Sequence, residues 1–142
     1  MSFWDASAVV PLCLATAPVE LRALAAQETD ASHWWATRVE CVSAFARRTR
    51  EGQLTPPSLL KADRALETLL SAWTEIEPTD SIRDRAERLL RLHPLRAADA
   101  LQLAAALDAT DGAPGGWGFV SLDNRLRAAA AKEGFTILPA TV

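Results

Sequence analysis

Asp99 is an acidic residue in a stretch of sequence where a charge needs an explanation. It lies near the start of Leu95 to Leu107, a segment that is otherwise almost wholly apolar. Ala, Leu and Gln favour helices, and a helix that is apolar nearly all round is normally buried. A buried ionised carboxylate is costly unless a cation, hydrogen bonds or a metal ion compensates it. Those partners must come from other segments, because Asp108 falls on the opposite face of the same helix.

Two further aspartates follow short apolar runs that we interpret as buried strands. Asp5 follows Ser2-Phe3-Trp4, and Asp123 stands at the carboxyl end of Trp117 to Leu122. Ligands of open α/β sheets bind beyond the carboxyl ends of the strands, so both aspartates occupy positions typical of a binding site. A fourth carboxylate, Glu40, falls in the first turn of a predicted helix.

Each of these carboxylates also has a purely structural interpretation. Asp5 and Asp123 are good N-cap residues for the helices that follow them. Thr37-Arg38-Val39-Glu40 matches a capping box that opens a helix running to about Glu51. A first-turn Asp99 that faces solvent is favoured by the helix dipole. The functional interpretation depends on the joint pattern of the four and not on any one of them.

Hydrophobic periodicity, caps and breakers divide the chain into alternating strands and helices. We expect strands at residues 2–4, 32–35, 74–77, 117–122 and 135–138. We expect helices that start near Ser7, after Ala17, at Thr37, at Thr55, after Pro78, at Leu95 and at Asn124. The buried stripe of the Thr37 helix is expected to consist of Val42, Phe45, Ala46 and Thr49. This alternation predicts an α/β fold with a short, mostly parallel central sheet flanked by helices, in a single domain over residues 1–142.

The composition excludes several classes of protein. The chain has 142 residues, 49% of them hydrophobic and 23% charged, which suits a folded domain and not a disordered chain. A net charge of −3 argues against a broadly basic surface for nucleic acid, so any such contact must be local. Cys13 and Cys41 lack metal-ligand spacing and suit small buried residues in a reducing cytosol. Without a basic leader or a run of ~18 apolar residues, we expect a cytoplasmic protein with no membrane contact.

Four motifs in chain order carry a resemblance to a known family. The first two are Asp5-Ala6-Ser7, an Asp followed after one residue by Ser, and Glu40 at the start of a helix. The most specific is Asp99-Ala100-Leu101 within the apolar helix, and the last is Ser121-Leu122-Asp123. Over essentially its whole length the chain resembles the PIN-domain ribonucleases, and specifically the VapC-like toxins of bacterial toxin–antitoxin pairs.

The resemblance implies a PIN-like α/β/α sandwich and a metal-dependent endoribonuclease that hydrolyses RNA phosphodiester bonds. The chemistry gives a separate reason for such a cluster. Mg²⁺ and Mn²⁺ are hard ions that take oxygen ligands, and phosphodiester hydrolysis needs an activated water and neutralisation of developing charge. Carboxylates brought together would otherwise repel one another, and bound divalent metal relieves that repulsion.

We therefore predict catalytic roles for Asp5, Glu40, Asp99 and Asp123. Asp5 and Asp99 are expected to bind Mg²⁺ or Mn²⁺ directly, and Asp123 directly or through water. Glu40 is expected to act through water or to orient the attacking water. Ser7 and Ser121 are expected to hold a carboxylate or a water in place. Some family members have a further acidic residue where this chain has Asn124 and Arg125, which leaves the number of metal ions open.

The resemblance also implies three partners: an RNA substrate, a cognate antitoxin protein and a second copy of the chain. Arg47, Arg48 and Arg96 are the candidate residues for holding RNA. We expect a homodimer because two apolar sets exceed what a small core readily hides. They are the helical stripe Leu59, Leu66, Leu70 and Trp73, and the pair Trp34-Trp35.

Two other functions fit parts of the sequence. A PIN-like module that binds RNA or protein without catalysis would share the fold, and loss of a site carboxylate would have favoured it. A phosphatase of the haloacid dehalogenase type also begins with a strand and an Asp, but it would need a second acid where Ser7 stands. The motifs do not distinguish transfer, ribosomal and messenger RNA, because all three present the same phosphate chemistry.

Overall fold

A five-stranded sheet in which every strand is parallel to its neighbours forms the centre of the computed structural model, which describes residues 1–141. The strand order is β3-β2-β1-β4-β5. The strands are β1 (Ser2–Trp4), β2 (Ala31–Trp34), β3 (Thr74–Ile76), β4 (Gly118–Val120) and β5 (Thr136–Leu138). Because all five run the same way, their carboxyl ends lie along one edge of the sheet, and β1 is the central strand.

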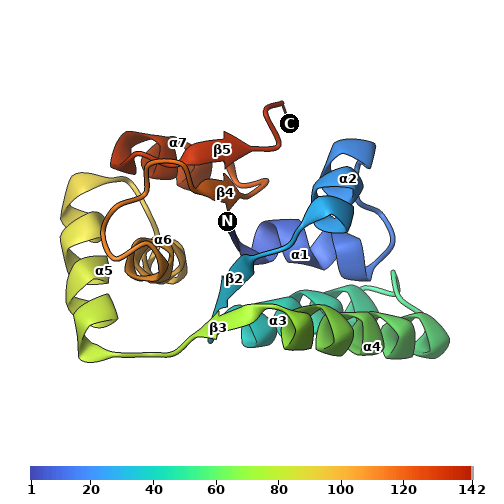
Figure 1. The fold of residues 1–142 in the computed structure, drawn as a ribbon. Coiled ribbons are helices and arrows are strands. Elements are labelled where there is room, and N and C mark those ends of the chain that lie inside the picture. Colours follow the sequence, from blue (N-terminus) through green and yellow to red (C-terminus); the bar gives the residue numbers. More distant parts are fainter. Residues whose placement is uncertain (142) are drawn as a thin grey trace.

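Helices cover both faces of this sheet (Figure 1). One face carries α1 (Ala6–Cys13), α2 (Val19–Gln27), α3 (Thr37–Arg50) and α4 (Pro56–Ala72). The other carries α5 (Asp80–Leu92), α6 (Ala97–Ala109) and α7 (Asn124–Glu133). The α/β class and the α/β/α layering predicted from the sequence are confirmed.

The central strand is buried on both faces, which explains why it is a continuous apolar run. Phe3 stacks on Phe119 of β4, with ring centroids 5.7 Å apart, on the side of α6. Trp4, the next residue, points to the other side and packs against Trp73, with centroids 4.9 Å apart. Both side chains are fully buried, so β1 fixes the residue that follows it between two hydrophobic cores.

Helix α3 begins differently from the expectation. Its N-cap is Ala36, no side chain caps it, and Thr37 is the buried first residue of the helix. The predicted capping box between Thr37 and Glu40 is therefore wrong, because both side chains turn toward α6 instead of the helix end. The predicted apolar stripe is also rotated: Cys41 and Phe45 are buried, whereas Val42 is 47% exposed.

The apolar residues on which we based the homodimer are mostly hidden within one chain. Trp34 is only 4% exposed and belongs to the core beside α6, whereas its neighbour Trp35 is 50% exposed. Leu66 and Leu70 of α4 are buried, and Trp73 is partly buried against Trp4. Apart from Trp35, the two apolar sets therefore do not provide the exposed surface from which we predict a homodimer.

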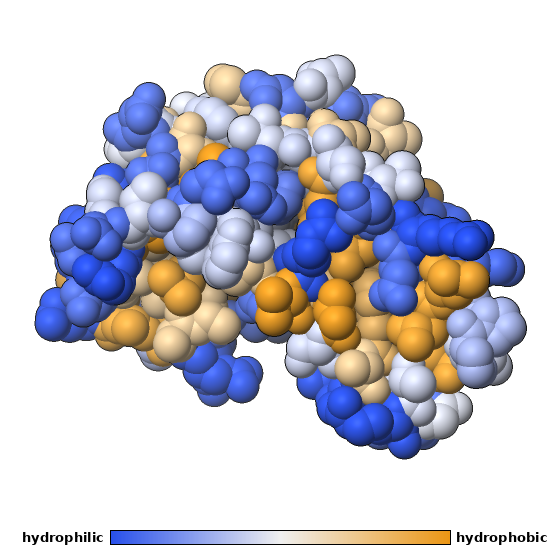
Figure 2. Space-filling model, turned by 90° about the horizontal axis from the view of Figure 1, so that it is seen from below, coloured by the Kyte–Doolittle hydropathy of each residue, from blue (hydrophilic) through white to orange (hydrophobic). Residues whose placement is uncertain are grey.

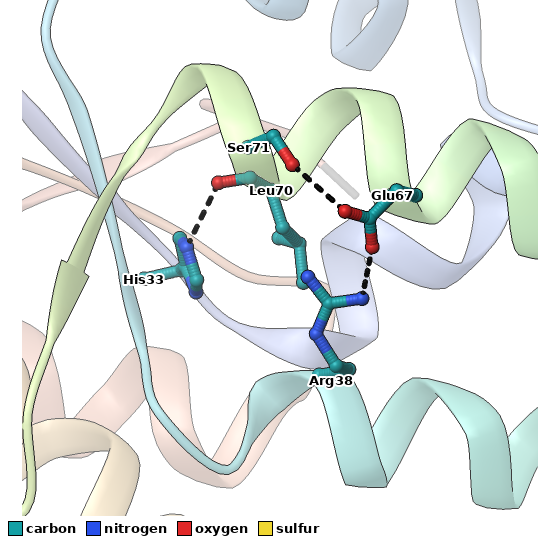
Figure 3. Close-up of polar contacts among 5 residues, drawn as sticks. All are labelled: His33, Arg38, Glu67, Leu70 and Ser71. Carbon is teal, nitrogen blue, oxygen red and sulfur yellow. Dashed lines mark hydrogen bonds and ion pairs between the residues drawn. The ribbon is translucent and has the colours of Figure 1, made fainter.

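A set of polar contacts fixes the start of α3 against α4 (Figure 3). The His33 ring of β2 lies between the carbonyl oxygens of Trp34 and Leu70, 3.3 Å from each. Arg38 donates to Glu67 of α4 at 2.6 Å, and Ser71 donates to the other oxygen of the same carboxylate at 3.1 Å. Arg38 thereby connects the first turn of α3, which carries Glu40, to α4, and His33 connects the end of β2 to the same helix.

Cys13 and Cys41 are buried free thiols, as predicted. Within residues 1–141, no helix has both the length and the apolar character needed to cross a membrane.

Candidate active site

Asp5 lies at the carboxyl end of the central strand and is the most enclosed of the four predicted carboxylates, at 4% exposure. Its backbone N–H donates to the Val120 carbonyl of β4, and its side chain caps α1 by accepting from the Ser7 N–H at 3.3 Å. The hydroxyl groups of Ser7 and Ser121 also donate to Asp5, both to the same oxygen, Oδ2. Within residues 1–141, no protein group donates to Oδ1 of Asp5, so that oxygen is open to a cation.

Ser7 and Ser121 join the ends of β1 and β4 around Asp5. Their hydroxyl oxygens lie 3.2 Å apart, and Ser7 Oγ accepts from the Leu122 N–H at 2.9 Å. Ser121 Oγ accepts from the Asp123 N–H at 3.1 Å. The two serines therefore connect Asp5 to the backbone that carries Asp123, which is the arrangement in which they would hold a carboxylate in place.

Asp123 and Asp99 come from the first turns of two helices on the other face. Asp123 is the N-cap of α7 and accepts from the Leu126 N–H at 3.1 Å through Oδ1. Asp99 lies in the first turn of α6 and is partly buried. Asp5 and Asp123 can each cap a helix and also bind a cation. The cap occupies one carboxylate oxygen and leaves the other available.

Glu40 projects from the first turn of α3 toward α6. Its carboxylate accepts a hydrogen bond from the side-chain amide of Gln102, and the same amide nitrogen donates to Thr37 Oγ1 at 2.9 Å. Gln102 lies three residues after Asp99, so both occupy one face of α6. The structure thus brings Glu40 to the side of α6 that carries Asp99.

Burial and mutual repulsion disfavour the ionised forms of these side chains. Burial raises the pKa of Asp5 to about 6, opposed by the hydrogen bonds from Ser7 and Ser121 and reinforced by the charge of Asp123. Burial also raises the pKa of Glu40 to about 7, opposed by the Gln102 hydrogen bond and reinforced by Asp5 and Asp99.

The charge of Asp99 acts on the same cluster. Burial and the charge of Asp123 raise the pKa of Asp99, and the positive charges of Arg96 and Arg125 oppose that rise. Pairwise repulsion therefore links the four carboxylates: Asp123 acts on both Asp5 and Asp99, and Asp5 and Asp99 both act on Glu40. Negative charges linked in this way form a site that favours a cation.

The protein itself does not supply that cation. Among residues 1–141, none of the four carboxylates forms a salt bridge with a Lys, Arg or His side chain. Over the same residues, no three His, Cys, Asp or Glu side chains lie close enough together to hold one metal ion as the structure stands. The four carboxylates are thus linked by pairwise repulsion, but they do not form a closed coordination shell.

A groove between α1 and α3 extends from this cluster. It has a volume of about 320 Å³ and is lined by Ala6, Ser7, Val10, Pro11, Glu40, Ala44, Arg47 and Arg48. Two of the three arginines predicted to hold RNA therefore share a groove with Glu40. The third, Arg96, is the N-cap residue of α6, and its charge acts on Asp99.

Three residues near the site were missed from the sequence. Gln102 was detectable, because it and Asp99 are the two polar side chains on an otherwise apolar stretch of α6 and are spaced to share a face. Arg125, noted only as a departure from the family, places its charge near Asp99. Arg127 donates to the carbonyl oxygens of Ser121 and Pro139, both at 2.8 Å, and so fixes the end of β4, a role with no sequence signal.

The histidines take no part in this cluster. Burial lowers the pKa of His33, which favours a neutral ring between two backbone carbonyls. His93 lies 2.7 Å from Glu133 and joins the end of α5 to α7. The described residues therefore offer carboxylate chemistry at this edge of the sheet, and neither histidine is placed to act as the base for a nucleophile there.

The backbone arrangement is shared with two solved structures. PAE2754 from Pyrobaculum aerophilum has a TM-score of 0.69 at 20% identity, covering 96% of this chain and 89% of its own. A toxin–antitoxin complex from Klebsiella pneumoniae has a TM-score of 0.65 at 17% identity, covering 96% of this chain and 97% of the matched chain. These likenesses define the class of fold: an α/β/α sandwich built on a parallel sheet.

No protein-family profile matches the chain. Its sequence is similar to two curated proteins from Mycobacterium tuberculosis, ribonuclease VapC45 of strain CDC 1551 / Oshkosh and ribonuclease VapC49 of strain ATCC 25618 / H37Rv. Each is 35% identical over 101 residues, which cover 71% of this chain and 68% of the relative. The chain belongs to the VapC family of PIN-domain ribonucleases.

Proposed function

We propose that this protein is an endoribonuclease toxin that hydrolyses RNA phosphodiester bonds with the help of Mg²⁺ or Mn²⁺. The observation that carries the proposal is the set of four carboxylates at one sheet edge, linked by pairwise repulsion and without a salt-bridge partner in the described part of the chain. The family membership supplies the ribonuclease activity. The toxin role is supported by the fold shared with a toxin–antitoxin complex.

The donor set suits a hard divalent cation. The carboxylates provide oxygen ligands only, and both Asp5 Oδ1 and the second oxygen of Asp123 lack protein hydrogen bonds among those found. Mg²⁺ usually keeps several waters and binds through one or two carboxylates plus substrate phosphate oxygens. An open arrangement, in which no three acidic side chains among residues 1–141 converge, is therefore compatible with Mg²⁺.

In this proposal each side chain has a defined task. A bound divalent ion would polarise the phosphate and neutralise charge that develops on its oxygens. Asp5 and Asp99 hold the ion directly, and Asp123 holds it directly or through water. Glu40 orients the attacking water. Ser7 and Ser121 keep Asp5 in one rotamer by donating to its Oδ2, so that Oδ1 would be available to hold the ion.

RNA reaches the carboxylates along the groove between α1 and α3. Arg47 and Arg48 line that groove together with Glu40, so a phosphate next to the scissile one would meet positive charge there. Arg96 and Arg125 supply positive charge on the side of Asp99. These four arginines let an acidic protein of net charge −3 bind RNA locally.

Two protein partners complete the proposal. A cognate antitoxin is the partner that a toxin of this family requires, and the matched Klebsiella pneumoniae structure is itself a toxin–antitoxin complex. A second copy of the chain is proposed from exposed apolar side chains. They are Trp35, which the sequence analysis named for this role, Val39 and Val42 of α3, and Leu60 of α4.

The competing functions have less support. A phosphatase of the haloacid dehalogenase type needs an acid at the position of Ser7, which is a serine that donates to Asp5. A binding module without catalysis does not explain why four acidic side chains gather at one sheet edge without a Lys, Arg or His salt-bridge partner in residues 1–141. Only cleavage by the purified protein distinguishes that module from the enzyme.

The test is cleavage of a pool of end-labelled single-stranded RNAs with Mg²⁺, with Mn²⁺ and with a chelator. The Asp5→Asn variant, purified in parallel, controls for contaminating ribonuclease. We expect cleavage by the wild-type protein with either ion, and none with chelator or with the variant. A folded wild-type protein that binds RNA but does not cleave it would favour the binding module, and cleavage that survives the chelator would reject the metal.

A further inference from the structure

Gln102 is fully buried in α6, and its amide makes contacts that reach outside that helix. The amide nitrogen donates to Glu40 and Thr37 of α3, residues more than sixty positions earlier in the chain. The amide oxygen, Oε1, is buried and has no hydrogen-bond partner among the described residues. Burying an amide with one end unsatisfied is unfavourable, so an apolar residue would suit the core better at this position. The hydrogen bonds to Glu40 and Thr37 of α3 offset the cost of burying the unpaired amide oxygen.

Glu40 depends on this contact for its direction. Its carboxylate has no other hydrogen bond among those found, and the charges of Asp5 and Asp99 repel it. A glutamate has three rotatable side-chain bonds, so repulsion would turn an unanchored Glu40 away from the cluster. The buried amide holds it toward the side of α6 that also carries Asp99, because residues 99 and 102 share one helix face.

We propose that Gln102 is a positioning residue of the ribonuclease site. Its amide fixes the Glu40 carboxylate where it orients the attacking water, and Thr37 accepts the second N–H so that the amide keeps one orientation. Gln102 touches neither RNA nor the ion and acts only through Glu40. The inference rests on the proposed function, because it assigns a role within that same site.

A double-mutant cycle tests whether Gln102 acts through Glu40. Gln102→Met keeps the length of the side chain and removes the donor, and Glu40→Gln keeps the shape and removes the charge. In single-turnover cleavage we expect Gln102→Met to be slower by about 10- to 100-fold, the usual effect of losing a group that orients a site residue. The double variant should be no slower than Glu40→Gln alone, because the effect of one residue passes through the other.

Thr110→Val provides the matched control. Thr110 is another buried polar residue of the α6 region, and its hydroxyl donates to the Leu107 carbonyl at 2.8 Å, at the opposite end of the helix from the site. We expect this variant to melt at a lower temperature and to cleave RNA at the wild-type rate. A Gln102→Met protein that loses stability but cleaves as fast as Thr110→Val would overturn the proposal.

A second readout does not depend on cleavage. Melting temperatures of the same four proteins of the cycle, measured in a chelator, report whether Gln102 and Glu40 interact in the metal-free fold. Non-additive shifts support the contact, and additive shifts overturn it. If the wild-type protein cleaves no RNA, the proposed function fails by itself, and the melting cycle still decides whether Gln102 positions Glu40.

Discussion

Asp99 is the carboxylate whose charge and role can be separated most cleanly. Burial and the neighbouring charge of Asp123 both raise its pKa, so its ionised form is unfavourable in the metal-free fold. Asp99→Asn removes that charge at nearly constant volume. We expect this variant to lose RNA cleavage and to melt at the same temperature as the wild type or higher, measured by thermal unfolding in parallel with a cleavage assay.

Asp108→Asn is the control for that experiment. Asp108 lies on the opposite face of α6, so its substitution should leave cleavage unchanged. Wild-type cleavage by Asp99→Asn in saturating Mg²⁺ would remove Asp99 from the site.

Asp5 makes the stability of the metal-free protein depend on pH. Burial raises its pKa from 3.8 to about 6, so between those values the folded state holds a proton that the unfolded state has lost. Stability attributable to Asp5 is therefore complete below about pH 4 and falls as the pH rises to about 6, by roughly 3 kcal/mol. The measurement is the melting difference between wild type and Asp5→Asn in a chelator from pH 4 to pH 8.

We expect Asp5→Asn to be the more stable protein at pH 8 and to lose that advantage toward pH 4. Added Mg²⁺ should raise the melting temperature of the wild type more than that of the variant at pH 8, because the ion binds the ionised carboxylate. A melting difference that is constant across the range would show that Asp5 does not carry the unfavourable charge.

The four acidic residues could be selected from sequence because strand ends, a first turn and an apolar helix mark positions with few alternatives. Ser7 and Ser121 were also predicted to hold a carboxylate, and both donate to Asp5, but the partner of Glu40 could not be selected in this way. The capping box at Thr37 and Glu40 is a local pattern, whereas the partner that draws both side chains away is Gln102, on a helix that packs there only after folding. Local patterns carry no information about such distant competitors.

At the scale of whole elements, the strands and helices were predictable, and their orientations were less so. Breakers and caps mark element ends within one or two residues, and Asn124–Glu133 is helical as expected. The buried face of α3 was misjudged because Val42 and Phe45 are equally apolar in sequence. Which of them faces inward depends on where α1 and α4 pack, and periodicity within one helix does not contain that information.

The turns that end α7 and α3 differ in how firmly they require glycine. Gly134 ends α7 at a φ of +109°, and a Cβ there would lie 3.1 Å from Cγ of Pro114. Gly134→Ala combines backbone strain with a clash, so we expect it to destabilise the protein by about 2 kcal/mol in urea unfolding.

Gly52 gives the comparison after α3. Its φ is +74°, and a Cβ there would meet nothing within 4 Å. Gly52→Ala should cost about 1 kcal/mol, from the backbone conformation alone. A smaller loss for Gly134→Ala than for Gly52→Ala would mean that the contact with Pro114 relaxes freely.

At the scale of the whole molecule, the exposed face of α3 and α4 is where we predict a second copy to pack. Figure 2 shows hydrophobic atoms gathered over these helices on the face seen from below. A hollow of about 360 Å³ lies there, lined by Val42, Phe45, Ala46, Thr49, Arg50, Leu59 and Asp63. Val39, on the same helix, is 65% exposed. We expect a homodimer at micromolar concentration in light scattering, held by apolar contact across this face.

Substitutions on two faces test the location of that contact. The double variant Val39→Asp and Val42→Asp should shift the protein to a monomer without loss of secondary structure, because both side chains already face solvent. Leu92→Asp, on α5, is equally exposed and should leave the dimer unchanged. A wild-type protein that is monomeric at these concentrations contradicts the prediction, and a dimer that only Leu92→Asp dissociates would place the contact elsewhere.

The central position of β1 has a consequence for how this protein is made. Its neighbours are β2 and β4, and β4 pairs Ser2 with Gly118 near the other end of the chain. Translation proceeds from the amino end at about 5–20 residues per second, and contacts between distant residues form late. Asp5 is synthesised 116 residues before Ser121, whose hydroxyl group donates to it. A growing chain that has not yet reached Asp123 therefore carries only part of the acidic site.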